Sequence, residues 1–126
     1  MNVLIVEDDV FNAEAISEII RSRQYSSETV GTGREAIERI KKKGFDLVFL
    51  DIFLPDCKGY ELIPQFKEQC PGIGIVTMTG HNTRELELKV RSFMPNYYMI
   101  KPFRVDEVEE VLNHISKKMR EEVAAA

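Results

Sequence analysis

The sequence predicts an α/β protein built on one five-stranded, parallel, doubly wound sheet with five helices. Short continuous apolar runs alternate with segments whose apolar residues recur at helical spacing. Such runs are typical of strands that are buried on both faces of a parallel sheet. Right-handed crossovers then place helices on both faces of the sheet. We expect the strand order 2-1-3-4-5, in which the first and third strands are neighbours.

The first two strand–helix units are predicted in residues 1–44. The first strand is Asn2–Val6, and Asp8 or Asp9 caps the helix that follows. The second strand, around Ser27–Val30, has a weaker apolar signal because it contains polar residues, and Gly31–Gly33 turns the chain into the second helix. The inward positions of these helices are Asn12 or Ala13, Ile16, Ile19 and Ile20 in the first, and Ala36, Ile37 and Ile40 in the second.

Three further units complete the predicted domain. Their strands are Asp46–Leu50, Ile73–Met78 and Tyr97–Ile100. The third helix begins near Gly59, contains Pro64 and ends before Pro71 and Gly72. The apolar stripes of the last three helices are Leu62, Ile63 and Phe66, then Leu86, Val90 and Phe93, and finally Val105, Val108, Leu112, Ile115 and Met119. The domain is expected to cover residues 1–121, with a frayed or appended tail at 122–126.

Composition excludes several classes of function. The length of 126 residues fits one domain, and a net charge of −4 with a pI near 5.3 argues against direct nucleic-acid binding. No apolar run approaches the roughly 20 residues that span a bilayer. Cys57 and Cys70 lack the spacing of metal ligands, so we expect reduced thiols in a cytoplasmic protein.

Charged or hydroxyl side chains stand at the ends of four predicted strands. Glu7 and Asp8 follow the first strand, Asp51 the third, Thr79 the fourth and Lys101 the fifth. The carboxyl ends of parallel strands share one edge of a sheet, and ligands bind there. Three carboxylates that converge would repel one another without a cation among them. The pattern therefore predicts a divalent-metal and phosphoryl site.

The residue types suit that chemistry. An aspartate such as Asp51 can attack phosphorus and form an acyl phosphate, although an Asp after a strand also commonly caps a turn. Glu7 and Asp8 offer the oxygen ligands that Mg²⁺ prefers. Lys101 supplies a compact cation that can reach either a phosphoryl oxygen or the Asp51 carboxylate. The clustering of the acids favours the functional interpretation of Asp51.

Four motifs in this order resemble the receiver domains of response regulators in two-component signalling. They are Val-Glu-Asp-Asp at 6–9, Leu-Asp-Ile-Phe-Leu-Pro at 50–55 followed by Gly59, Met-Thr-Gly at 78–80, and Ile-Lys-Pro-Phe at 100–103. The resemblance covers essentially the whole chain. It implies a flavodoxin-like fold and a phosphoryl group transferred to Asp51 from a sensor histidine kinase.

The resemblance also implies a metal site. Asp8, Asp51 and the backbone carbonyl of Phe53 would ligate Mg²⁺ directly, with Mn²⁺ as a plausible substitute. Glu7 would act mainly through water. Such a protein catalyses its own aspartyl phosphorylation and dephosphorylation, and is not a conventional enzyme.

Further roles follow from the same resemblance. Lys101 and Thr79 would bind the remaining phosphoryl oxygens, and a cis peptide before Pro102 would aim Lys101 into the site. Tyr98 would turn inward on activation, with Thr79 as its partner in the switch. Phe53 and His81 occupy positions that flank the phosphoryl group in the family. Phe53 is apolar and so cannot orient an attacking water.

The partners implied are a histidine kinase or a histidine phosphotransfer protein, and a downstream protein bound by the fourth helix, fifth strand and fifth helix. Dimerisation on phosphorylation is a further expectation.

Two alternative functions within the family are a phosphorelay intermediate and a receiver excised from a larger regulator or hybrid kinase. A Mg²⁺-dependent phosphatase would want a second acid where Phe53 stands. A pseudo-receiver should have lost an acid, Thr79 or Lys101, and none is missing.

Overall fold

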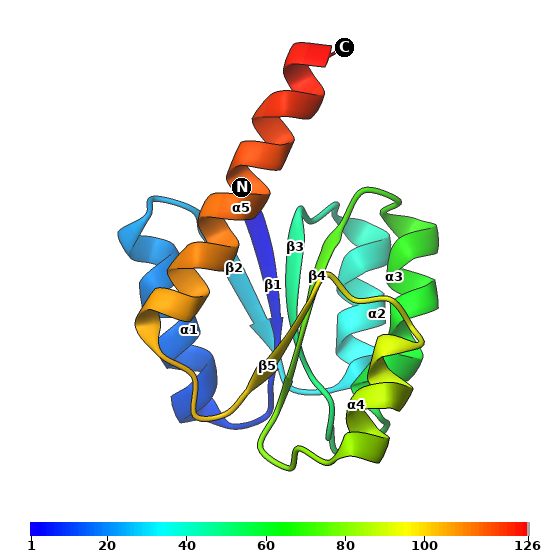
Figure 1. Cartoon of the computed structure of the whole chain (residues 1–126). Coiled ribbons are helices and arrows are strands. Elements are labelled where there is room, and N and C mark those ends of the chain that lie inside the picture. Colours follow the sequence, from blue (N-terminus) through cyan, green and yellow to red (C-terminus); the bar gives the residue numbers. More distant parts are fainter. Residues whose placement is uncertain (126) are drawn as a thin grey trace.

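The computed structural model describes residues 1–125 and contains one parallel sheet in the order β2-β1-β3-β4-β5, which confirms the predicted topology (Figure 1). The strands are β1 (Asn2–Val6), β2 (Ser26–Val30), β3 (Leu47–Asp51), β4 (Gly74–Thr79) and β5 (Tyr97–Ile100). The α-helices are α1 (Val10–Ser22), α2 (Gly33–Lys42), α3 (Ile63–Gln69), α4 (Arg84–Arg91) and α5 (Val105–Ala125). A short 3₁₀ helix, η1 (Gly59–Leu62), precedes α3.

The sheet lies between two layers of helices. Helices α1 and α5 cover one face, whereas α2, α3 and α4 cover the other (Figure 1). Successive strand side chains point to opposite faces, so each strand contributes to both cores. In β1, Val3 and Ile5 pack in the core under α1 and α5, while Leu4 and Val6 pack in the core under α2 and α3.

Side-chain caps explain where several helices begin. The Asp9 carboxylate accepts the N–H groups of Phe11 and Asn12 at the start of α1, so Asp9 is the cap rather than Asp8. Pro64 lies in the first turn of α3, where its missing N–H leaves no hydrogen bond unmade. The 3₁₀ turn η1 occupies the region where the sequence predicted the start of a single longer helix.

The central strands end one residue later than the sequence predicted. Asp51 is the last residue of β3 and Thr79 the last of β4, because their backbones still pair with the neighbouring strands at Met78 and Ile100. Both residues are therefore held by the sheet itself. Their side chains are buried, with residue exposures of 6% for Asp51 and 0% for Thr79.

Helix α5 continues well past the amino-terminal edge of the sheet (Figure 1). Its 21 residues correspond to about 31 Å at 1.5 Å per residue. Residues 122–125 of the expected tail are helical, and Ala126 lies outside the described residues. None of the helices in residues 1–125 has the length and apolar composition needed to cross a bilayer.

Candidate functional site

The structure brings the predicted site residues together at the carboxyl edge of the sheet. Glu7 and Asp8 follow β1, Asp51 ends β3, Thr79 ends β4 and Lys101 follows β5. Carboxylate oxygens of Glu7, Asp8 and Asp51 all lie within 4.8 Å of one another. The convergence of acids that the strand order predicted is therefore present.

Lys101 joins two of these acids. Its Nζ pairs with Oε1 of Glu7 and lies 3.4 Å from Oδ1 of Asp51. The sequence predicts that this lysine faces Asp51 or a phosphoryl group, whereas in the structure Glu7 is its nearer partner. The Lys101–Pro102 peptide is cis, as the family resemblance implied.

Burial shapes the electrostatics of this cluster. Loss of hydration raises the pKa of Glu7 to about 7, and neighbouring Asp51 adds to the rise, while Lys101 opposes it. Burial alone would lower the pKa of Lys101, but its hydrogen bond with Glu7 and the charge of Asp51 outweigh that effect and raise it. The lysine therefore stays protonated as the fixed cation of the site.

The donor set fits a hard divalent cation. Ionised carboxylates are acceptors only, and Oε2 of Glu7 is buried without a hydrogen-bond partner. A buried oxygen of this kind is costly unless a cation or a donor reaches it. Asp8 is exposed, so the cluster is buried on the side of Glu7 and Asp51 and open to solvent on the side of Asp8. Carboxylates with room for retained water suit Mg²⁺.

Thr79 presents a hydroxyl at this edge from the next strand. Its side chain is buried, and Oγ1 accepts the backbone N–H of His81 at 3.0 Å. Because the hydroxyl acts as the acceptor in this bond, its own proton remains free for another acceptor. That geometry suits a donor to an anionic oxygen.

Phe53 and His81, each two residues beyond a site residue, contact each other. Their rings meet edge to face with centroids 5.8 Å apart, and the Lys58 Nζ lies 4.4 Å from the centre of the Phe53 ring. Phe53 remains 37% exposed. The role of the Phe53 carbonyl as a metal ligand stays a prediction.

Tyr98 is held from outside by two residues that the sequence analysis did not single out. Its hydroxyl donates to Oδ1 of Asn82 at 2.8 Å, and the Arg91 guanidinium lies 5.4 Å from the ring centre. Burial, and then the charge of Glu87, raise the pKa of the Tyr98 phenol. Asn82 carried no sequence signal, because it lies in a loop with no motif linking it to Tyr98.

Two residues support the loop after Asp51. The Asp56 carboxylate accepts the N–H groups of Gly33 and Arg34 at 2.9 and 3.0 Å, which ties this loop to the start of α2. A Cβ added to Gly59 would lie 2.1 Å from the carbonyl oxygen of Asp51. Gly59 was part of the quoted motif, but its close approach to the Asp51 backbone was not visible in the sequence.

Comparison with known families identifies the class of protein. The family model described as the response regulator receiver domain matches residues 3–113. This range contains four strands, all of β1 except Asn2, and every residue of the acidic cluster. The chain belongs to the response regulator receiver family.

Curated relatives are longer than this chain. The regulatory protein LuxO of Vibrio cholerae is 31% identical over 114 residues, which are 90% of this chain and 25% of that protein. The cell cycle response regulator CtrA of Brucella ovis is 29% identical over 120 residues, which are 95% of this chain and 52% of that protein. The chain thus spans between a quarter and about half of these relatives.

Two solved receiver structures share the fold over nearly their whole length. A CheY-like receiver domain protein from Methanospirillum hungatei has a TM-score of 0.86 and 26% identity, covering 95% of this chain and 97% of that one. The beryllofluoride-activated receiver domain dimer of NtrC4 has a TM-score of 0.86 and 28% identity, covering 93% and 97%. Receiver-sized chains therefore superpose on this molecule almost end to end.

Proposed function

We propose that this receiver accepts a phosphoryl group on Asp51 from a phosphohistidine of a sensor kinase, and that the acyl phosphate switches its binding to a partner. The observation that carries the proposal is the position of the Asp51 carboxylate. It lies 3.4 Å from the Lys101 cation, and its oxygens approach those of Glu7 and Asp8 within 4.8 Å. A nucleophile, a fixed cation and an acidic cluster are the groups that phosphoryl transfer requires.

In the transfer step, an oxygen of Asp51 attacks phosphorus and forms a P–O bond. The P–N bond to the donor histidine breaks, and the imidazole nitrogen keeps the electron pair and takes up a proton. Lys101 and the Thr79 hydroxyl donate to oxygens of the transferred group. Asp8, Asp51 and the backbone carbonyl of Phe53 would hold Mg²⁺, with Glu7 acting mainly through water, and the metal would offset the negative charge of the acids and the phosphoryl group.

The switch follows from the charge of the product. An acyl phosphate adds nearly two negative charges beside two acids, and these attract the Thr79 hydroxyl. Movement of Thr79 would leave room for Tyr98 to turn inward from its bond with Asn82. The surface formed by α4, β5 and α5 then changes, which amounts to a population shift between two states. That surface would bind the downstream partner or a second activated receiver.

Transfer onward to a histidine phosphotransfer protein is the second use of the same chemistry. It would make the chain a relay intermediate, and it needs no change in the site. The chain's coverage of only part of its curated relatives also fits a receiver that works within a larger regulator. A constitutive pseudo-receiver is disfavoured because none of the site residues is missing, and the three acids and Lys101 lie together.

Incubation with phosphoramidate or acetyl phosphate and Mg²⁺, followed by intact-mass analysis, tests the proposal. The wild type should gain one phosphoryl group, and Asp51→Asn none, because an amide is nearly isosteric but a poor nucleophile. Asp106→Asn, an exposed acid of α5, is the matched control and should gain the group normally. Phosphorylation of Asp51→Asn would show that the assignment is wrong.

Thermal melts with and without millimolar Mg²⁺ test the metal site separately. Binding to the folded state should raise the melting temperature. Asp8→Ala should remove most of this gain and Glu7→Gln a smaller part. If the wild-type melts coincide, the acidic cluster is not a metal site, whatever the phosphorylation experiment gives.

A further inference from the structure

The last turns of α5 carry an apolar stripe that has no covering element. Ile115 is buried against the sheet, Met119 is partly buried, and Val123 is 77% exposed. These residues follow one another at intervals of four, so they share one side of the helix. The stripe that binds α5 to the domain therefore continues beyond the edge of the domain.

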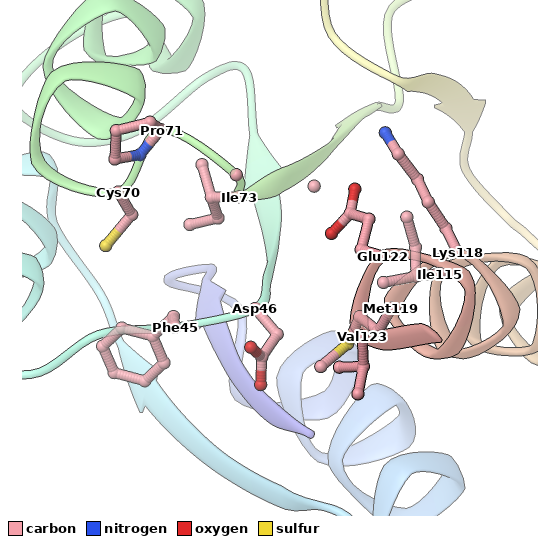
Figure 2. Close-up of a pocket in the computed structure, with 12 residues that line it drawn as sticks. Phe45, Asp46, Cys70, Pro71, Ile73, Ile115, Lys118, Met119, Glu122 and Val123 are labelled. Atoms are coloured by element: carbon pink, nitrogen blue, oxygen red, sulfur yellow. The ribbon is translucent and has the colours of Figure 1, made fainter. Parts of the chain in front are cut away.

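A hollow of about 440 Å³ lies under this overhanging end of α5. Figure 2 shows Phe45, Cys70, Pro71 and Ile73 of the body on one side, and the α5 residues on the other. A second apolar recess, lined by residues including Met1 and Tyr25, lies along the other flank of the same overhang. Met119 and Val123, which line both hollows, therefore face open space on either flank of the projecting end of α5.

The charges beside the stripe suit a second copy of the same helix. Lys118 and Glu122 lie one turn apart on the flank that borders the hollow (Figure 2). Within one helix, Lys preceding Glu by four residues is the less favourable order for a pair. In an antiparallel pair of α5 helices, centred near residue 120, each Lys118 would lie opposite the other copy's Glu122. Arg120 donates to Ser116 of its own helix at 2.8 Å.

We propose that this end of α5, with the hollow beneath it, is a self-association surface through which two copies pair antiparallel. Met119 and Val123 of one copy would cover those of the other, and each helix end would enter the hollow of its partner. A pair related by a two-fold axis makes every contact twice, which suits one apolar stripe and one Lys–Glu pair. The surface lies at the edge of the sheet opposite Asp51, so pairing needs no phosphorylation.

Light scattering and sedimentation at protein concentrations up to about 1 mM test the proposal. The wild type should dimerise without phosphorylation, and Val123→Glu should be monomeric, because the pair would bury its new charge. Lys117→Glu changes the charge of an exposed residue that lines neither the hollow nor the second recess, and is the control. A monomeric wild type, or equal loss of dimer in Lys117→Glu, would overturn the proposal.

Mixing two variants tests the antiparallel geometry. Lys118→Glu and Glu122→Lys should each be monomeric, because each brings like charges together across the pair. An equimolar mixture should recover dimers, since every Lys or Glu then meets its opposite in the other chain. Recovery requires contacts between chains, so a change confined to one helix cannot produce it. Absence of recovery, with circular dichroism showing both variants folded, would overturn the antiparallel pair.

Discussion

The centre of the sheet and its β5 side differ sharply in how firmly they are held. Every residue of β3 and β4 is buried, whereas β5 buries only Met99, and Ile100 at its end is 45% exposed. Helix α1 buries three residues and α4 only Val90. Asp51, the proposed nucleophile, thus lies in the well-buried centre of the sheet. The surface proposed to bind a partner, formed by α4, β5 and α5, includes elements with fewer buried residues. Regions with few buried contacts open most readily.

The sharpest test of this contrast compares one buried and one exposed side chain. Phe49→Ala in β3 should cost about 3–5 kcal/mol, because Phe49 is fully buried and its loss leaves a cavity. Leu88→Ala in α4 should change stability by less than about 0.5 kcal/mol, because Leu88 is 60% exposed. Urea unfolding of both variants measures the two values. Similar losses would mean that α4 is anchored as firmly as the centre.

Gly59→Ala should disturb the centre of the sheet next to Asp51, the proposed nucleophile. The added methyl group would lie 2.1 Å from the Asp51 carbonyl oxygen, so the loop must move, at a cost of roughly 1–3 kcal/mol. Phosphorylation by phosphoramidate should slow in the same variant. Gly44→Ala is the control, because its methyl group meets nothing within 4 Å. Normal stability and rate in Gly59→Ala would contradict the close approach.

Phe53→Asn should shorten the lifetime of the acyl phosphate by about tenfold, or about 1.4 kcal/mol in the barrier to hydrolysis. The Phe53 ring, two residues beyond Asp51, contacts His81 and offers water no hydrogen bond, whereas an amide can orient a water molecule. Decay of phosphorylated protein followed by intact mass gives the two lifetimes. An equal or slower decay in the variant would show that Phe53 does not shield the phosphoryl group.

Asn82→Ala should make Tyr98 on the β5 side of the sheet more mobile without unfolding the protein. Tyr98 would lose the hydrogen bond that holds its hydroxyl, worth about 0.5–1 kcal/mol, so its inward population should rise roughly two- to fivefold. NMR of labelled tyrosine rings reports the shift in the unphosphorylated protein. Asn113→Ala removes a hydrogen bond to Arg23 elsewhere and should leave Tyr98 unchanged. Identical Tyr98 spectra in all three proteins would refute the role of Asn82.

The smallest effect concerns pH and the loop beyond Asp51. Backbone N–H groups of Gly33, and then Arg34, lower the pKa of Asp56 below its usual 3.8. Ionised Asp56 therefore stabilises the fold above the unfolded-state pKa, and this contribution disappears as the pH falls through the lower folded-state value. Asp56→Asn should be less stable than the wild type at pH 7, and the difference should shrink in acid. A difference independent of pH would contradict this.

The sequence predicted the features that depend on strand order and strand ends. The bounds of β1 and β5 match the prediction, and Glu7, Asp51, Thr79 and Lys101 meet because parallel strands end at one edge. Strand order does not predict which side chains pair with one another at this edge of the sheet. The pairing of Glu7 with Lys101, and the bond from Tyr98 to Asn82, depend on side-chain orientations that no periodicity encodes.

The apolar stripe of the last helix gives no clear endpoint for that helix. The stripe extends to Met119, whereas α5 continues to Ala125, and the boundary of the domain at residue 121 stays a prediction. Polar residues such as Lys118 and Glu122 are good helix formers, however, and nothing in the sequence interrupts the helix before Ala125. Burial of the first half of α5 provides the nucleus on which these turns continue.

The site residues come from four strands that are far apart in the sequence. The order in which these strands are synthesised therefore decides when the complete site can form. Synthesis releases Glu7 and Asp51 first, and Lys101 is the last of the charged groups to leave the ribosome. Until β5 docks, these two acids have no cation from the chain itself beside them. If Asp51 accepts the phosphoryl group as proposed, a nascent domain that ends before Lys101 lacks the cation of its site, and competence to be phosphorylated would also report that β5 has been synthesised.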